Sequence, residues 1–116
     1  METNHEQTVL LVEDDSAARK LIARQIQSLG FKVIEATHGL DGVNLYAEIS
    51  PDIVVTDVNL PFINGRTLTR AIKRSDPLVP VIVVSGLVDQ CYPADVVLSK
   101  PFSIGDLNAA FNRVTT

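Results

Sequence analysis

Four short runs of β-branched and other apolar residues set the strongest limit on how this chain can fold. They lie at Thr8–Val12, Asp52–Thr56, Val79–Val84 and Asp95–Ser99, and a weaker fifth run lies at Phe31–Ala36. Continuous apolar runs of this length are typical of strands that are buried on both faces of a parallel sheet. We therefore expect a parallel sheet of five strands.

Amphipathic segments lie between these runs. Apolar residues at helical spacing predict helices at Ser16–Leu29, Leu40–Ile49, Thr67–Arg74 and Ile104–Val114. Gly30 is a stop signal for the first helix, and Ser103 with Asp106 resembles a capping box that opens the last one. Because strands and helices alternate, we expect a single doubly wound α/β domain over residues 1–116, with helices on both faces of an open sheet.

Composition excludes several classes of function. A net charge of −4 gives little basis for direct binding to nucleic acid, and no apolar run reaches the length of a membrane helix. The polar N-terminal segment has no signal-peptide core, so we expect a cytoplasmic protein. Cys91 is the only cysteine, and we interpret it as a packing or surface residue.

Polar residues gather where the predicted strands end: Glu13, Asp14 and Asp15 after the first, Asp57 after the third, Ser85 after the fourth and Lys100 after the fifth. In open α/β sheets the carboxyl ends of the strands form the binding site. Crowded carboxylates favour a bound hard cation, and few carboxylates with room for water and phosphate favour Mg²⁺. A lysine and a hydroxyl opposite them suit phosphoryl transfer. Each residue alone could instead be a helix cap, a turn residue or a surface residue.

Four motifs together resemble the receiver domains of two-component response regulators: Leu10-Leu11-Val12-Glu13-Asp14-Asp15, Val55-Thr56-Asp57-Val58-Asn59-Leu60-Pro61, Val83-Val84-Ser85-Gly86 and Lys100-Pro101-Phe102. The resemblance covers essentially the whole chain. Within the family, the chain is similar to single-domain chemotaxis regulators. It implies a flavodoxin-like strand order 2-1-3-4-5.

The resemblance also implies the metal ligands. Asp57 would be the phosphoacceptor, and Asp14, the Asp57 carboxylate and the backbone carbonyl of Asn59 would bind Mg²⁺. Glu13 would support the metal through water. Asp15 falls outside this set, so we interpret it as a helix cap.

Further roles follow from the same resemblance. Lys100 would contact a phosphoryl oxygen, and its bond to Pro101 would be cis. Ser85 would move towards the acyl phosphate as the switch, and Gly65 would occupy a place where a side chain is unwelcome. The donor would be a sensor histidine kinase or a histidine phosphotransfer protein, docking on the Ala17–Leu29 face and the turn at 102–103. The output would be an unidentified protein, and the domain would be a timed switch, not a turnover enzyme.

Two departures from the family pattern concern the output side. Val97 stands where many receivers carry Tyr or Phe on the fifth strand. Residues 85–93 are too few for a usual crossover with its helix, and Pro93 disfavours helical geometry at Tyr92. We therefore expect the fourth helix of the family to be shortened or replaced by a loop. His5 and His38 match no functional position, and we expect both at the surface.

Three other functions compete with this interpretation. Magnesium-dependent phosphohydrolases with an aspartate nucleophile resemble one another in a second aspartate two residues later, where this chain has Asn59. A nucleotide-binding module would need a glycine-rich turn after the first strand, where this chain has acids. A pseudo-receiver, which binds partners without phosphorylation, commonly lacks an acid, the acceptor or the lysine, and this chain keeps all of them.

Overall fold

A computed structural model describes residues 6–86 and 94–115 of the chain. Its strands are β1 (Thr8–Val12), β2 (Lys32–Ala36), β3 (Ile53–Asp57), β4 (Val81–Ser85) and β5 (Val96–Ser99). They form one sheet in the order β2-β1-β3-β4-β5, and every neighbouring pair is parallel. The prediction of a flavodoxin-like parallel sheet is confirmed.

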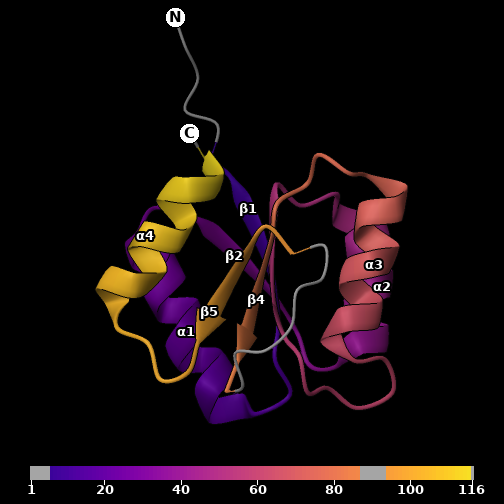
Figure 1. The fold of residues 1–116 in the computed structure, drawn as a ribbon, viewed down its shortest axis with the longest axis horizontal. Helices are drawn as coiled ribbons and strands as arrows, with labels where there is room; N and C mark the ends of the chain where they lie inside the picture. The colour runs from indigo at the N-terminus through magenta and orange to yellow at the C-terminus, as the bar shows by residue number, and fades with distance from the viewer. Residues whose placement is uncertain (1–5, 87–93, 116) are drawn as a thin grey trace, which may run out of the picture.

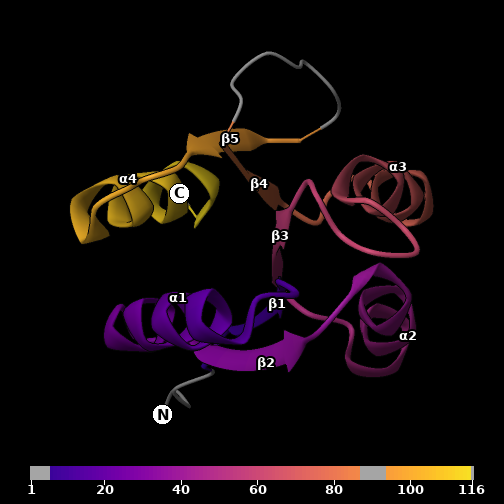
Figure 2. The same ribbon diagram turned by 90° about the horizontal axis from the view of Figure 1, so that it is seen from below.

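Helices cover both faces of this sheet, as Figures 1 and 2 show. The helices of the described residues are α1 (Ser16–Ser28), α2 (Gly39–Ile49), α3 (Gly65–Ser75) and α4 (Ile104–Thr115). One apolar core lies between the sheet and the α1 and α4 helices, and a second lies between the sheet and α2 and α3. The central strands are buried on both sides, which accounts for their continuous apolar sequences.

Side-chain caps set the start of three helices, and the sequence predicted two of these caps. Asp15 accepts a hydrogen bond of 2.8 Å from the backbone N–H of Ala18, so its predicted role as a cap of α1 is confirmed. Ser103 and Asp106 form a reciprocal capping box at α4, with both hydrogen bonds at 3.0 Å. Asn64 caps α3, and this cap starts the helix two residues before the predicted Thr67.

The strands differ from their predicted ranges by one or two residues. β3 and β4 each extend one residue further, to Asp57 and Ser85, because the ladder continues there with Asp57 opposite Val84 and Ser85 opposite Ser99. β4 begins two residues later than predicted, because the N–H of Val79 donates to a turn and not to the sheet. Two functional candidates therefore lie on rigid strand ends, not in loops.

The predicted loss of the fourth helix concerns a segment that lies mostly at residues 87–93, which are outside the described residues.

The remaining connections are short, and the expected Gly30 stop is present, with a φ of 100° just after α1. Within residues 6–86 and 94–115, none of the helices has the length and apolar character needed to cross a membrane.

Candidate functional site

Three carboxylates meet at the carboxyl end of the sheet. Glu13 and Asp14 follow β1, and Asp57 ends the adjacent β3, whose Thr56 lies opposite Val12. One oxygen from each of the three carboxylates lies within 4.8 Å of the others. Glu13 is 2% exposed and Asp57 is 8% exposed, so two of these charges have little contact with water. The predicted acidic cluster is therefore present.

The backbone around Asp57 is closely packed. The hydroxyl of Thr56 donates to the Asp57 carbonyl at 2.9 Å, and the N–H of Val58 donates to Val84 of β4 at 3.2 Å. A side chain at Gly65 would place its Cβ against the Asp57 carbonyl oxygen, closer than van der Waals contact allows. The expectation that Gly65 occupies a place where a side chain is unwelcome is confirmed.

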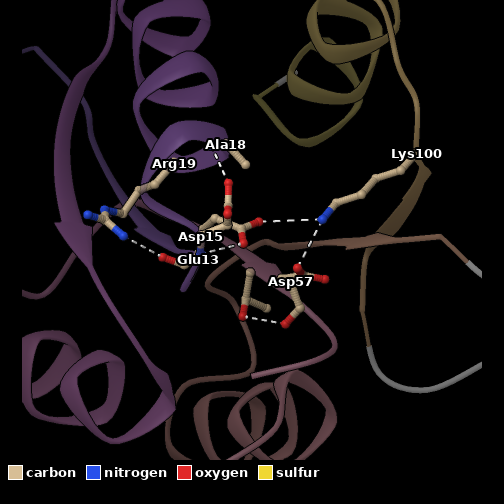
Figure 3. Close-up of polar contacts among 7 residues, drawn as sticks. Glu13, Asp15, Ala18, Arg19, Asp57 and Lys100 are labelled. Atoms are coloured by element: carbon tan, nitrogen blue, oxygen red, sulfur yellow. Dashed lines mark hydrogen bonds and ion pairs between the residues drawn. The ribbon is translucent and has the colours of Figure 1, made fainter. Parts of the chain in front are cut away.

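Lys100 brings a positive charge to the cluster from the end of β5. Its Nζ lies 3.0 Å from Oδ2 of Asp57 and 3.5 Å from Oε1 of Glu13, as Figure 3 shows. Its backbone N–H donates to the carbonyl of Ser85 at 2.8 Å, and its bond to Pro101 is cis, as expected. Burial lowers the pKa of Lys100, but the hydrogen bond and charge of Asp57, together with Glu13, outweigh burial and raise it. The lysine is thus held in its charged form.

The environment of Glu13 shows that the carboxylates are not fully compensated. Burial raises the pKa of Glu13, and the nearby charge of Asp57 raises it further. The N–H of Asp15, which donates to Oε2 of Glu13 at 3.1 Å, and the charge of Lys100 act in the opposite direction. One lysine faces three carboxylates, and the excess negative charge and the oxygen donors suit a divalent hard cation.

Asp14 and Asp15 have different surroundings although they are neighbours. The Asp14 side chain is exposed and has no hydrogen-bond or ion-pair partner among the described residues. Asp15 already accepts the N–H of Ala18. Asp14 is therefore the exposed carboxylate that is available to a metal, while Asp15 serves the helix. Asn59, the other predicted ligand, is exposed two residues beyond Asp57.

Ser85 is buried at the end of β4, one position beyond the residue that pairs with Asp57. Its carbonyl binds the backbone of Lys100, so the hydroxyl-bearing residue and the lysine come from paired strands. Val97, which replaces the usual aromatic residue, is half-buried opposite Val83. The structure thus gathers Asp57, Ser85 and Lys100 at one edge, as the sequence predicted.

The sequence did not indicate the contacts of two further residues, one beside the site and one at the start of α2. Arg19 of α1 binds the carbonyl of Glu13 at 3.0 Å and the carboxylate of Glu35 at 3.1 Å. His38, expected simply at the surface, is half-buried and accepts the N–H of Asp41 as the cap of α2. Histidine is not among the preferred capping residues, and Arg19 lies far from Glu35 in sequence, so neither contact has a local signal.

An apolar hollow of about 440 Å³ adjoins the acidic cluster. Its walls come from α1 and from the segment after β5, and include Leu21, Ile22, Lys100 and Phe102. Leu21 is 57% exposed, so its apolar side chain is open to a partner at this hollow. The hollow connects the predicted docking elements with the lysine of the site.

Comparison with known proteins agrees with this geometry. Residues 9–112 match the family model of the response regulator receiver domain. The chain is 39% identical to the sensor kinase CckA of Brucella abortus over 86% of its own length, but it spans 12% of that kinase. It is 31% identical to the chemotaxis protein CheY of Thermotoga maritima, over 92% of this chain and 96% of that protein. A receiver domain protein from Clostridium thermocellum is 27% identical in sequence, with a TM-score of 0.86 and 93% of both chains covered.

Proposed function

Because this chain belongs to the family of response regulator receiver domains, the phosphoacceptors of two-component signalling, we propose that Asp57 accepts the phosphoryl group here. Receiver domains bind Mg²⁺ in their acidic pocket. In this chain we assign the metal to Glu13, Asp14, Asp57 and the backbone carbonyl of Asn59. The observation that carries the assignment is the meeting of three carboxylates within 4.8 Å, with Lys100 3.0 Å from Asp57.

The chemistry is a transfer between two nucleophiles. An oxygen of the Asp57 carboxylate attacks the phosphorus of a phosphohistidine in line with the bond to nitrogen. The new O–P bond forms as the N–P bond breaks, and the histidine nitrogen leaves with the electron pair. When bound, Mg²⁺ neutralises negative charge on the phosphoryl oxygens.

Lys100 and Ser85 act on the same phosphoryl group. Lys100 donates to a phosphoryl oxygen, and its present contact with Asp57 places its ammonium group within reach of that oxygen. Ser85 turns its hydroxyl towards the acyl phosphate and so reports the phosphorylated state. Because Val97 is not aromatic, this movement is not coupled to an aromatic side chain at that position of β5.

The relatives include receivers of sensor kinases and of regulators, which implies kinase or phosphotransfer partners. We assign the docking of that partner to the apolar hollow beside Lys100. Leu21 on α1 and Phe102 after β5 line it, and both elements were expected to form the docking surface. Lys100 lines this hollow and its Nζ lies 3.0 Å from Oδ2 of Asp57, so a partner seated there lies next to the acceptor. Receiver domains are signalling modules, and we propose that this one is a switch of the cytoplasm whose acyl phosphate hydrolyses later.

Phosphorylation with a small donor tests the assignment directly. We expect acetyl phosphate to add one phosphoryl group to the wild-type protein, seen by intact mass, only when Mg²⁺ is present. Asp57→Asn should abolish the addition. Asp15→Asn is the matched control, because asparagine still caps α1 and the change removes one carboxylate beside the site.

Several outcomes would contradict this proposal. Undiminished labelling of Asp57→Asn, or phosphate mapped to a serine, threonine or histidine, would show that the acceptor is misassigned. Equal labelling with and without Mg²⁺ would show that the acidic cluster does not act through a metal. Loss of labelling in Asp15→Asn, with its melting temperature unchanged, would show that the register of the acidic residues is misread.

A further inference from the structure

Arg19 joins three elements that meet beside the acidic cluster. It lies in the first turn of α1, and its Nη1 donates to the backbone carbonyl of Glu13 at 3.0 Å, just beyond the end of β1. Its Nε donates to Oε1 of Glu35 on β2 at 3.1 Å. Figure 3 shows the guanidinium group of Arg19 against the Glu13 carbonyl, on the side of Glu13 away from Lys100.

The carbonyl that Arg19 binds belongs to the peptide unit between Glu13 and Asp14. A peptide unit is planar, so a hydrogen bond that fixes its oxygen also fixes the N–H and the Cα of the next residue. The Asp14 side chain has no partner of its own among the described residues. The orientation of the Asp14 carboxylate therefore depends on how its backbone is held.

Other contacts fix the rest of this short connection. The N–H of Glu13 donates to the carbonyl of Ala36 on β2 at 3.1 Å, and Asp15 is held by the cap of α1. Between these two anchors, the N–H of Asp15 donates to the Glu13 side chain at 3.1 Å, and Arg19 binds the Glu13 carbonyl, which belongs to the peptide unit that leads to Asp14. Arg19 itself is well ordered by its surroundings, because its side chain is only 13% exposed and is paired with Glu35.

We propose that Arg19 is a positioning residue for the metal site, which holds the Glu13–Asp14 peptide so that both carboxylates face the ion. This inference rests on the metal site assigned above. Arg19 touches neither the metal nor the phosphoryl group, and it acts through the backbone. Such outer contacts commonly change metal affinity by about 10- to 100-fold.

The sign of the effect separates this role from simple electrostatics. Removing a positive charge near a cation site strengthens cation binding by Coulomb's law, whereas loss of positioning weakens it. We expect Arg19→Met, which keeps most of the aliphatic stem, to weaken Mg²⁺ binding about tenfold in calorimetric titration. Arg24→Met is the matched control, because Arg24 is exposed on the same helix and the variant loses the same charge. Its Mg²⁺ affinity should be unchanged or slightly higher.

Arg19→Lys keeps the charge but loses the planar fork that reaches two acceptors at once. We expect it also to weaken Mg²⁺ binding, with a melting temperature close to that of the wild type, so the proposal stays testable if Arg19→Met folds poorly. With acetyl phosphate, the Mg²⁺ concentration for half-maximal phosphorylation should rise in the Arg19 variants, while the rate at saturating Mg²⁺ should change little.

The results separate the inference from the proposed function. Failure of the wild-type protein to bind Mg²⁺ would overturn the metal site itself. Binding by the wild type with unchanged or tighter binding by the Arg19 variants would overturn only the positioning role. A lower melting temperature without a change in Mg²⁺ affinity would assign Arg19 a purely structural role and would also overturn the inference.

Discussion

Asp14→Asn tests whether the site is built for a cation at the expense of the metal-free fold. Asp14 is exposed, has no hydrogen-bond or ion-pair partner among the described residues, and lies with two buried carboxylates. Asparagine has nearly the same shape and no charge. We therefore expect the variant to be more stable than the wild type when no metal is present, because repulsion between like charges is removed.

The distances within the cluster give the expected size of this gain in stability. At 4.8 Å, the upper limit of the separations in this cluster, two unit charges repel by about 0.9 kcal/mol in water, and salt at 0.15 M reduces this to about 0.5 kcal/mol. Asp14 has two such neighbours, Glu13 and Asp57, so the free energy of unfolding should rise by about 1 kcal/mol. For a chain of 116 residues this corresponds to an increase of about 4 °C in melting temperature.

Thermal melts with and without Mg²⁺ provide the assay. In EDTA, Asp14→Asn should melt above the wild type, and the difference should shrink in 1 M NaCl because salt screens the repulsion. In excess Mg²⁺ the order should reverse, because a ligand stabilises only the form that binds it. Asp15→Asn is the control, since it keeps the cap of α1 and should respond to Mg²⁺ as the wild type does.

Two results would refute this reasoning. The first is a clear loss of stability in metal-free Asp14→Asn, which would mean that the Asp14 carboxylate makes a net stabilising interaction. The second is an equal rise in melting temperature with Mg²⁺ for wild type and Asp14→Asn, which would remove Asp14 from the metal ligands.

Three further predictions concern neighbouring residues. Burial and the charge of Asp57 raise the pKa of Glu13, so the folded state is stabilised relative to the unfolded chain while Glu13 is protonated, and this stability is lost as pH rises above about 4.5. Glu13→Gln should therefore be more stable than the metal-free wild type at neutral pH, and melts from pH 4 to 8 test this. The pKa of Lys100 is also raised, so its charged form stabilises the folded state until pH rises past about 10.5. Lys100→Met should therefore destabilise the metal-free protein at pH 7, and melts at increasing pH should show this difference shrink above about 10.5. Gly65→Ala should lower the free energy of unfolding by about 2 kcal/mol or more, because its Cβ would meet the Asp57 carbonyl. Gly30→Ala, which meets no neighbouring atom among the described residues but loses a favourable φ of 100°, should cost less, and melting temperatures of both variants test the difference.

Much of the site could be predicted from the sequence because its order along the chain reflects the order of the strands. Apolar runs predicted the strands, and in a parallel sheet their carboxyl ends lie at one edge. The polar residues that end those runs, Asp57, Ser85 and Lys100, were therefore expected together before any contact was known. The caps at Asp15 and Ser103 were also readable, since a capping side chain binds a backbone group only a few residues away.

Only the tertiary structure decided the contacts between residues that are distant in sequence. Arg19 reaches Glu35 and the carbonyl of Glu13 because β2 pairs with β1 and α1 crosses above them. The extension of β3 to Asp57 depends on the ladder with β4, and no local property of the chain ends the strand there. A capping or periodic pattern is a short-range signal, whereas these contacts depend on sheet order, register and helix placement. The sequence thus determined which groups reach the site, and the packing of the elements decided how they are held.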